Sequence, residues 1–296
     1  MSGSARGAVG TVAVLLVAAL SAGTGVAQLP SQVPSLPSLT AEMLLGMAKV
    51  DLPTEDGVSL EIHADFPEEA PLLLDGLEIY SLTATITPEG QLVLGSTQTA
   101  QTAASGDGGT PECSDDAFVP TGQNWAAENM PVRWAMNRRS IPRSLSKDLT
   151  HLEIRRAHRI WTHVFSRCID TDPVSFDYAY AGTTFRHPDF DDVNAVDFGS
   201  LGGGILALNY VWHSGTNILE VDLRLNKKDY RWTNVPGVKR YQVKNVVTHE
   251  LGHQFGLDDL GDPHGALTMF GRIAKGERKK ISLGRGDVRG AELLSP

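Results

Sequence analysis

The segment that decides the fold is His249–Asp259, with the sequence HELGHQFGLDD. The residues before it, 238–247, have a helix-forming composition with regularly spaced valines. If this helix continues through the segment, His249 and His253 lie one turn apart on the same face. Two imidazoles at that spacing can bind one metal ion, and neutral imidazole is a good ligand for zinc. The spacing therefore predicts a metal site on a helix.

The residues that follow the first histidine complete this prediction. Glu250 lies about 100° further round the helix, where it can reach a metal-bound water without binding the metal, which is the role of a general base. Gly256 is expected to end the helix, because glycine adopts the left-handed conformation readily. The chain can then turn back and bring Asp259 to the metal as a third ligand. His264, eleven residues beyond His253, is the alternative third ligand.

Chance is a weak explanation for this pattern. With 9 histidines and 30 glycines in 296 residues, H-E-x-x-H arises by chance in about one such chain in a hundred, and in about one in ten thousand with Gly256 and Asp259 at fixed offsets. The alternative interpretation is an ordinary solvated helix that carries two histidines.

The pattern H-E-x-x-H-x-x-G-x-x-D resembles that of the metzincin zinc endopeptidases, and most closely matrixin-like secreted bacterial members. Aspartate as the third ligand is similar to the snapalysin type. Ala266–Gly271 is placed to supply the methionine turn of that group, with Met269. The resemblance covers roughly residues 111–296 and includes further matches: Trp134, Asn137, Trp161, Ala207, Asp222, Trp232, Thr233 and 286–290.

The resemblance implies a fold and a set of roles. The fold is α/β of the α+β zincin type, with a mixed, twisted five-stranded sheet and three helices. One zinc ion would be held by His249, His253 and Asp259, with Glu250 as the catalytic base and Met269 packed beneath the metal. The strand 205–212 would lie at the sheet edge and bind the substrate backbone, and residues 270–284 would wall the pocket. The substrate-binding residues would then include Ala207, Leu208 and Asn209.

Charge is unevenly distributed along the chain, whose net charge is −9. Residues 28–110 contain twelve acidic residues and a single basic one, whereas residues 111–296 are nearly neutral. This balance argues against nucleic-acid binding. The acidic leader could pack electrostatically on a basic face of the following domain, or it could be a solubilising segment.

The first 27 residues have the features of an export signal: one early arginine, an apolar run, and a G-x-A pattern that predicts cleavage after Ala27. An uncleaved membrane anchor is the alternative, but the apolar run is shorter than the roughly 20 residues of a bilayer span. We therefore expect a secreted protein without membrane association after signal removal.

Four regions follow from composition and periodicity: a signal peptide (1–27), an acidic, propeptide-like leader (28–96), a flexible linker (97–110) and a catalytic domain (111–296). In the leader we expect a helix at 41–49 and strands at 58–62, 77–86 and 91–94, which would form a small β prodomain or accessory module. The linker, rich in Thr, Gln, Ala, Ser and Gly, is a candidate processing site.

The catalytic region shows strands alternating with long helices, which favours a mixed α/β sheet. Strands are expected at 131–137, 174–180, 194–198, 205–212 and 218–225. Helices are expected at 146–167, from 238 through the metal motif, and at 286–294. The first helix has a predicted apolar stripe of Leu149, Leu152, Ala157, Ile160, Trp161, Val164 and Phe165.

The two cysteines, Cys113 and Cys168, would meet an oxidising environment after export. A disulfide between them would be worth roughly 4 kcal/mol at most. The alternative is a cysteine switch, in which the thiolate of Cys113 occupies the open position of zinc. The residues around Cys113 lack the arginine and glycine of the matrixin switch.

Two further patterns have competing interpretations. Carboxylate and amide oxygens gather within 189–197 and could bind calcium, or form a solvated acidic turn: Asp189, Asp191, Asp192, Asn194 and Asp197. Residues 285–287 spell the adhesion tripeptide Arg-Gly-Asp but also open the last predicted helix.

Together these features predict a secreted, monomeric, zinc-dependent endopeptidase acting on protein or peptide substrates. A dormant zymogen that awaits removal of residues 28–110 is a variant of this prediction. The alternative from another class is a catalytically silent, zinc-stabilised secreted binding or adhesion protein.

Overall fold

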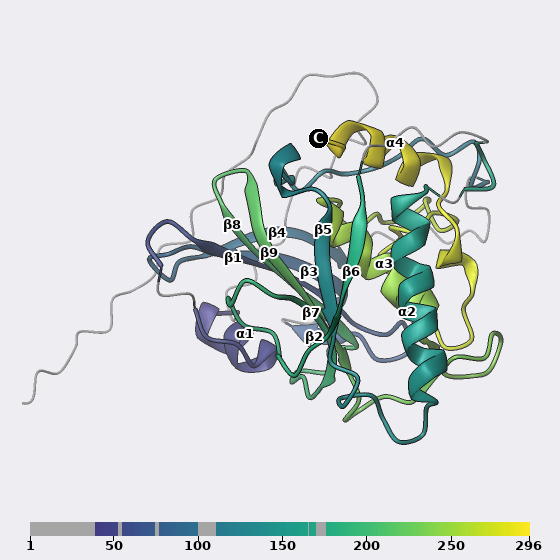
Figure 1. The fold of residues 1–296 in the computed structure, drawn as a ribbon, viewed down its shortest axis with the longest axis horizontal. Helices are drawn as coiled ribbons and strands as arrows, with labels where there is room; N and C mark the ends of the chain where they lie inside the picture. The colour runs from purple at the N-terminus through teal and green to yellow at the C-terminus, as the bar shows by residue number, and fades with distance from the viewer. Residues whose placement is uncertain (1–38, 53–54, 75–76, 100–110, 165, 170–175) are drawn as a thin grey trace, which may run out of the picture.

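One mixed sheet of nine strands runs through the molecule, with the order β2-β3-β1-β8-β9-β7-β5-β6 and β4 paired to β3 (Figure 1). The computed structural model describes residues 39–52, 55–74, 77–99, 111–164, 166–169 and 176–296. The predicted signal peptide and most of the predicted linker lie outside the described residues. None of the helices within these ranges is long and apolar enough to cross a membrane.

Five strands of this sheet come from the predicted catalytic region. They are β5 (Val132–Met136), β6 (Tyr178–Thr183), β7 (Asn194–Gly199), β8 (Ala207–Ser214) and β9 (Asn217–Asn226). Three pairings, β5·β6, β5·β7 and β7·β9, are parallel, whereas β8 is antiparallel to β9. Three helices accompany them: α2 (Lys147–Thr162), α3 (Val243–Phe255) and α4 (Arg285–Leu294). The predicted five-stranded mixed sheet with three helices is therefore confirmed for this region.

Helix α2 differs from its prediction at one end and on one face. It ends at Thr162, five residues early, with His163 as its C-cap. Leu149 and Leu152, two residues of the predicted apolar stripe, are 39% and 42% exposed. Ala157, Ile160 and Trp161 of the predicted stripe are buried, and the rest of the buried face consists of Thr150, Glu153, Ile154 and His158. The two leucines lie off this face, so their apolar character misplaced the stripe.

Helix α3 carries the metal motif. It begins at Val243 rather than 238, because the two residues before it form β11 (Tyr241–Gln242), which pairs in parallel with β10 (Trp232–Thr233). It ends as predicted at Gly256, whose φ of 102° is left-handed. A Cβ at this glycine would lie 2.4 Å from the backbone oxygen of Gln123, so the turn has no room for a side chain.

The remaining strands and one helix come from the leader. They are α1 (Ala41–Ala48), β1 (Ser59–Asp65), β2 (Leu72–Leu74), β3 (Leu77–Ile86) and β4 (Leu92–Thr99). Strand β1 pairs antiparallel with β3 on one side and with β8 on the other, in a register from Ser59 opposite His213 to Asp65 opposite Ala207. The leader sheet is therefore continuous with that of the catalytic region.

This pairing corrects one sequence expectation. The strand predicted at 205–212 is the edge of the five-stranded sheet, but in the full chain β8 lies between β9 and β1. An exposed strand edge presents unpaired N–H and C=O groups, and β1 satisfies them.

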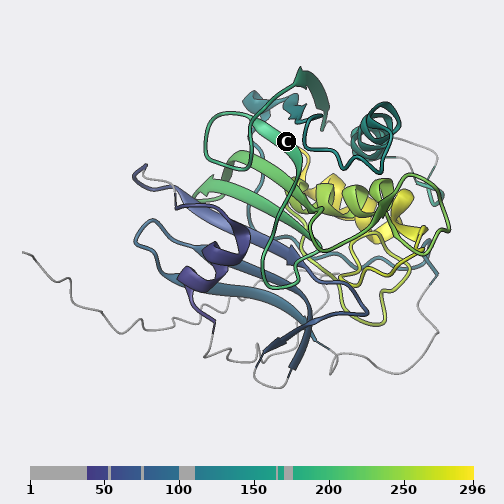
Figure 2. The ribbon, with the colours of Figure 1, turned by 90° about the horizontal axis from the view of Figure 1, so that it is seen from below.

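A second apolar core lies between the leader and β8. Leu208, Tyr210 and Trp212 alternate along β8 and pack with α1 and with apolar side chains of β1. Figure 2 shows α1 on the side of the strands away from α2 and α3. The helix sits close to the backbone of the domain: Gly202 N–H donates to the carbonyl of Met47 at 2.8 Å, and a Cβ at Gly203 would lie 2.2 Å from Met47 Sδ. Strand pairing and apolar packing thus dominate this interface, rather than the charge complementarity considered above.

The buried ring of His158 gives a testable pH dependence. It stacks on Trp134 at a centroid distance of 3.6 Å, and burial lowers its pKa to about 3. Between pH 6.5 and 3 the unfolded chain therefore binds a proton at this site that the folded chain does not, so acid lowers the free energy of unfolding. Replacing His158 with Phe is expected to flatten that dependence by up to about 1.4 kcal/mol per pH unit. Urea unfolding at pH 7, 6 and 5 measures it, and equal slopes for the two proteins would contradict the assignment.

Candidate metal centre

Four buried side chains converge beside α3. His249 and His253 come from the helix, Asp259 follows the Gly256 turn, and Asp65 ends strand β1 of the leader. Each offers one ligand atom, and these atoms all lie within 4.8 Å of one another. All four residues are at most 2% exposed. The structure thus brings together the three residues predicted as metal ligands and adds a fourth that sequence reasoning missed.

The imidazoles are oriented by backbone carbonyls. His249 Nδ1 lies 2.7 Å from the carbonyl oxygen of Thr268, and His253 Nδ1 lies 2.9 Å from that of Leu257. Because a carbonyl only accepts, each Nδ1 carries the proton and donates it, which leaves Nε2 facing the cluster. Neither Nε2 has a hydrogen-bond partner. Buried nitrogens of this kind, held through the other ring nitrogen, are typical of metal ligands.

The acidic member expected from the sequence lies against both rings. Asp259 Oδ1 is 3.2 Å from His249 Nε2, and Asp259 Oδ2 is 3.8 Å from His253 Nε2. Two imidazole nitrogens and carboxylate oxygen form a donor set that zinc accepts. The residues present therefore fit a zinc ion.

The charges within the cluster favour a cation. Burial lowers the pKa of His253 to about 4. Burial also acts against the charged form of His249, but the carboxylates of Asp65 and Asp259 outweigh it and raise the pKa of His249 to about 9. A proton on His249 thus partly neutralises the acidic side chains, and a metal ion would replace that proton on binding.

Glu250 is fully buried next to the ligands and is positioned by an amide. Asn209 Nδ2 donates to the carboxylate Oε2 of Glu250 and, at 3.0 Å, to its backbone carbonyl. Gln254 holds the other end of that amide, donating to Asn209 Oδ1 at 3.0 Å. Burial first, and then the negative charge of Asp65, raise the pKa of Glu250 well above its usual value. Glu250 Oε1 has no hydrogen-bond partner, so one oxygen stays available for a proton.

The three residues assigned to substrate binding have other neighbours in the full chain. The side chain of Asn209 is committed to Glu250 and Gln254. Leu208 packs in the leader core, and Ala207 lies opposite Asp65 in the β1·β8 register. The leader therefore covers the strand that was expected to receive substrate.

The predicted methionine turn packs beneath the metal motif. Met269 is 1% exposed, and a Cβ at Gly252 would lie 2.1 Å from its Sδ, so the two residues are in close contact. The turn is held from below by Asp287, which accepts from the backbone N–H of Thr268 at 2.9 Å and of Met269 at 3.0 Å.

A buried lysine also supports this turn. Lys280 Nζ donates to the carbonyl oxygens of Thr268 and Phe270, and burial lowers its pKa. Sequence reasoning missed both Lys280 and Asp287 as supports. Asp287 belongs to the Arg-Gly-Asp tripeptide, and its carboxylate is buried, which excludes adhesion through that sequence in this fold.

Other sequence candidates lie elsewhere. Cys113 and Cys168 form a disulfide, so the thiol of Cys113 is not available for a cysteine switch. His264 pairs with Asp115 at 2.9 Å and is not part of the cluster, which removes it as the rival third ligand.

Groups in the acidic segment 189–197 form hydrogen bonds with side chains elsewhere in the protein. Asp197 makes two hydrogen bonds to Arg224, each of 2.8 Å, and the backbone N–H groups of Asp191 and Asp192 donate to Glu220. Among the described residues, the groups that could hold a metal include none from this segment. Calcium binding there stays a prediction.

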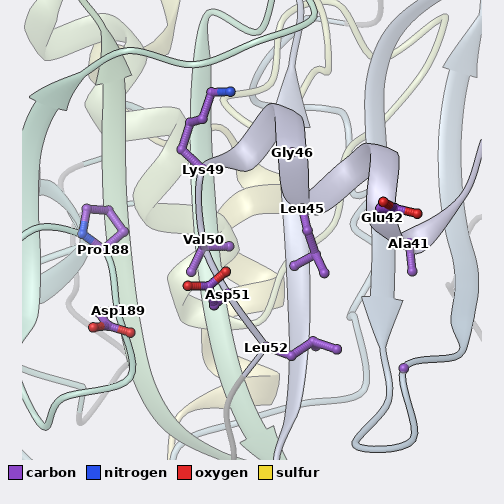
Figure 3. Close-up of a pocket in the computed structure, with 11 residues that line it drawn as sticks. Ala41, Glu42, Leu45, Gly46, Lys49, Val50, Asp51, Leu52, Pro188 and Asp189 are labelled. Carbon is purple, nitrogen blue, oxygen red and sulfur yellow. The ribbon is translucent and has the colours of Figure 1, made fainter. Parts of the chain in front are cut away.

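The pocket drawn in Figure 3 lies between α1 and the Pro188–Asp189 loop. Its lining includes Glu42, Lys49 and Asp51 but none of the metal-cluster residues. The metal-cluster residues are instead buried, and the leader contributes one of them, Asp65.

Comparison with known families gives one finding. The family model for matrixin, a peptidase family, matches residues 124–294. The match includes β5 to β9 and the helices α2, α3 and α4, together with His249, His253 and Asp259. It does not include the leader, and so it does not include Asp65.

Proposed function

The chain belongs to the matrixin family and is a zinc metallopeptidase, and from this premise we propose that it is a secreted endopeptidase that its own leader keeps latent. The observation that supports this most directly is the convergence of three predicted ligands, two of them with unpartnered Nε2 atoms, beside a buried glutamate.

In this proposal His249, His253 and Asp259 would hold the zinc ion. Bound zinc supplies Lewis-acid polarisation of the peptide carbonyl and lowers the pKa of a water molecule. Removal of the leader takes away the charge of Asp65 that raises the pKa of Glu250, and Glu250 would then accept the proton of the attacking water and pass it to the departing amine. Asn209 holds the carboxylate of Glu250 in place during both transfers. Met269 and Asp287 hold the turn in place beneath helix α3.

Substrate binding follows from the strand that the leader covers. Once β1 is removed, β8 presents an unpaired edge beside the metal cluster, and an extended peptide can pair with it as β1 does. Residues 270–284 also contact the leader, through a bridge between Ile273 and Pro67. The geometry therefore favours peptide substrates bound in extended form.

Latency and secretion are supported by separate observations. The leader occupies β8 along its length, so a substrate cannot use that edge in the intact chain. The predicted export signal and the Cys113–Cys168 disulfide are both typical of an oxidising, extracellular setting.

The test uses the chain after proteolytic cutting within residues 97–110 and removal of the leader. We expect one zinc per molecule, hydrolysis of casein or of an unstructured peptide, and loss of that hydrolysis with a zinc chelator. Added zinc should restore it. A leader-free protein that keeps one zinc but cleaves no peptide would contradict the proposal and favour a silent binding protein. The family's match and the placement of Glu250 favour the enzyme.

A further inference from the structure

The carboxylate of Asp65 lies in the metal cluster although it belongs to the leader. Its Oδ2 is 3.1 Å from His249 Nε2, and the residue is 1% exposed. No backbone or amide donor binds the carboxylate oxygens of Asp65, and the groups that face them are His249 and the carboxyl group of Glu250. A buried carboxylate beside a second carboxyl group is costly unless a cation compensates it.

The backbone on both sides of Asp65 fixes it in that place. The residue is the last one of β1 paired with β8, and its carbonyl accepts from the N–H of Leu206 at 2.7 Å. The chain then reaches the 270–284 segment, where Glu68 N–H donates to the carbonyl of Ile273 at 3.0 Å. The leader therefore runs from the β8 edge to the 270–284 wall and carries Asp65 over the cluster between these two anchors.

The donors in the cluster now number four, with two nitrogens and two carboxylates: His249, His253, Asp259 and Asp65. Catalytic zinc sites keep three protein ligands and one open position, whereas structural sites are closed by four. Cys113, the alternative group for closing the site, is bonded to Cys168 in a disulfide.

We propose that Asp65 is the fourth ligand of the metal in the full-length chain, so that the leader closes the position a catalytic water must occupy. This inference rests on the proposed function, since it takes the other three residues as zinc ligands. It assigns the inhibitory contact to a carboxylate of the leader strand rather than to a thiol.

Cobalt(II) in place of zinc gives a readout that does not depend on activity. In the full-length chain, Asp65→Ala should retain cobalt on the three remaining ligands but change its visible absorption bands, because a carboxylate leaves the coordination sphere. Removal of the metal by EDTA should become at least about tenfold faster. Asp65→Asn keeps the shape of the side chain and should be intermediate in the rate of metal loss.

Glu61→Gln is the matched control. Glu61 lies four residues earlier on β1, is also buried, and hydrogen-bonds at 2.8 Å to His63, whose ring stacks on His253, so Glu61→Gln removes a nearby charge without removing one of the four donors. This change should leave the cobalt spectrum and the rate of metal loss as in the unmodified chain. The rise in Tm on adding metal should be smaller for Asp65→Asn than for Glu61→Gln, which tests the assignment even if Asp65→Ala does not fold.

The possible failures are distinguishable. If the unmodified chain binds no stoichiometric cobalt, or if His249→Ala does not abolish binding, both this inference and the proposed function are wrong. If His249→Ala abolishes binding but both Asp65 variants behave like Glu61→Gln, only this inference is overturned.

Discussion

Replacing Glu250 with Gln in the leader-free protein is expected to lower kcat/KM for a peptide by about 10²–10⁴-fold, the usual contribution of a positioned acid–base group. Glutamine has nearly the same shape but cannot accept the proton of the attacking water. The zinc content should not change, because Glu250 is not among the four residues that converge as ligands. The measurement is kcat/KM for one peptide together with metal analysis of the same sample.

Asn209→Ala separates positioning from proton transfer. Its amide holds both the carboxylate and the backbone carbonyl of Glu250, so its loss should lower kcat by about tenfold with little change in KM, the pattern of an interaction that acts in the transition state. A Glu250→Gln protein that keeps full zinc and hydrolyses peptide at the original rate would assign the proton transfer to another group. An Asn209 effect confined to KM would instead support its assignment to substrate binding.

Features that depend on the local spacing of residues could be predicted from the sequence. Helix α3 places His249 and His253 on one face and ends at Gly256, because the 3.6-residue period and the tolerance of glycine for positive φ are local properties. The strands at 194–225 could likewise be predicted from alternation. Leu149 and Leu152 of α2 are apolar but exposed. Which face of a helix is buried depends on where the rest of the core lies, and local spacing does not show this.

The contribution of the leader could not be predicted in the same way. Alternation indicated the strand of β1 but carried no information about its partner, since strand pairing is chosen by which edges meet in the folded chain. Asp65 looked like any other acidic residue of an acidic leader, because only the β1·β8 register places it beside His249. Lys280 had no local signal at all, and its burial follows from the two carbonyl groups it contacts.

Cutting the linker and then diluting the protein is expected to raise the activity per molecule by at least about 100-fold. A covalent tether as short as the predicted linker gives the leader an effective concentration of roughly 1 mM, so a leader with a Kd of about 1 μM would leave about one chain in a thousand open. After cleavage the tether is lost, and dissociation follows mass action. The cut protein should then have about tenfold higher specific activity at 10 nM than at 100 μM, whereas the uncut chain should show no dependence on concentration.

A substitution in the apolar face of α1 is expected to shift the equilibrium between bound and dissociated leader. Leu44 is fully buried in the core between the leader and β8, and a Leu→Ala change in such a site costs about 2–5 kcal/mol. In the cut protein, Leu44→Ala should therefore move the midpoint of the dilution curve to at least about tenfold higher concentration. Cut Glu250→Gln protein should stay nearly inactive at every dilution, which excludes a contaminating protease. If the cut protein is as active at 100 μM as at 10 nM, strand pairing and the apolar core do not hold the leader in place, and covalent attachment alone accounts for latency.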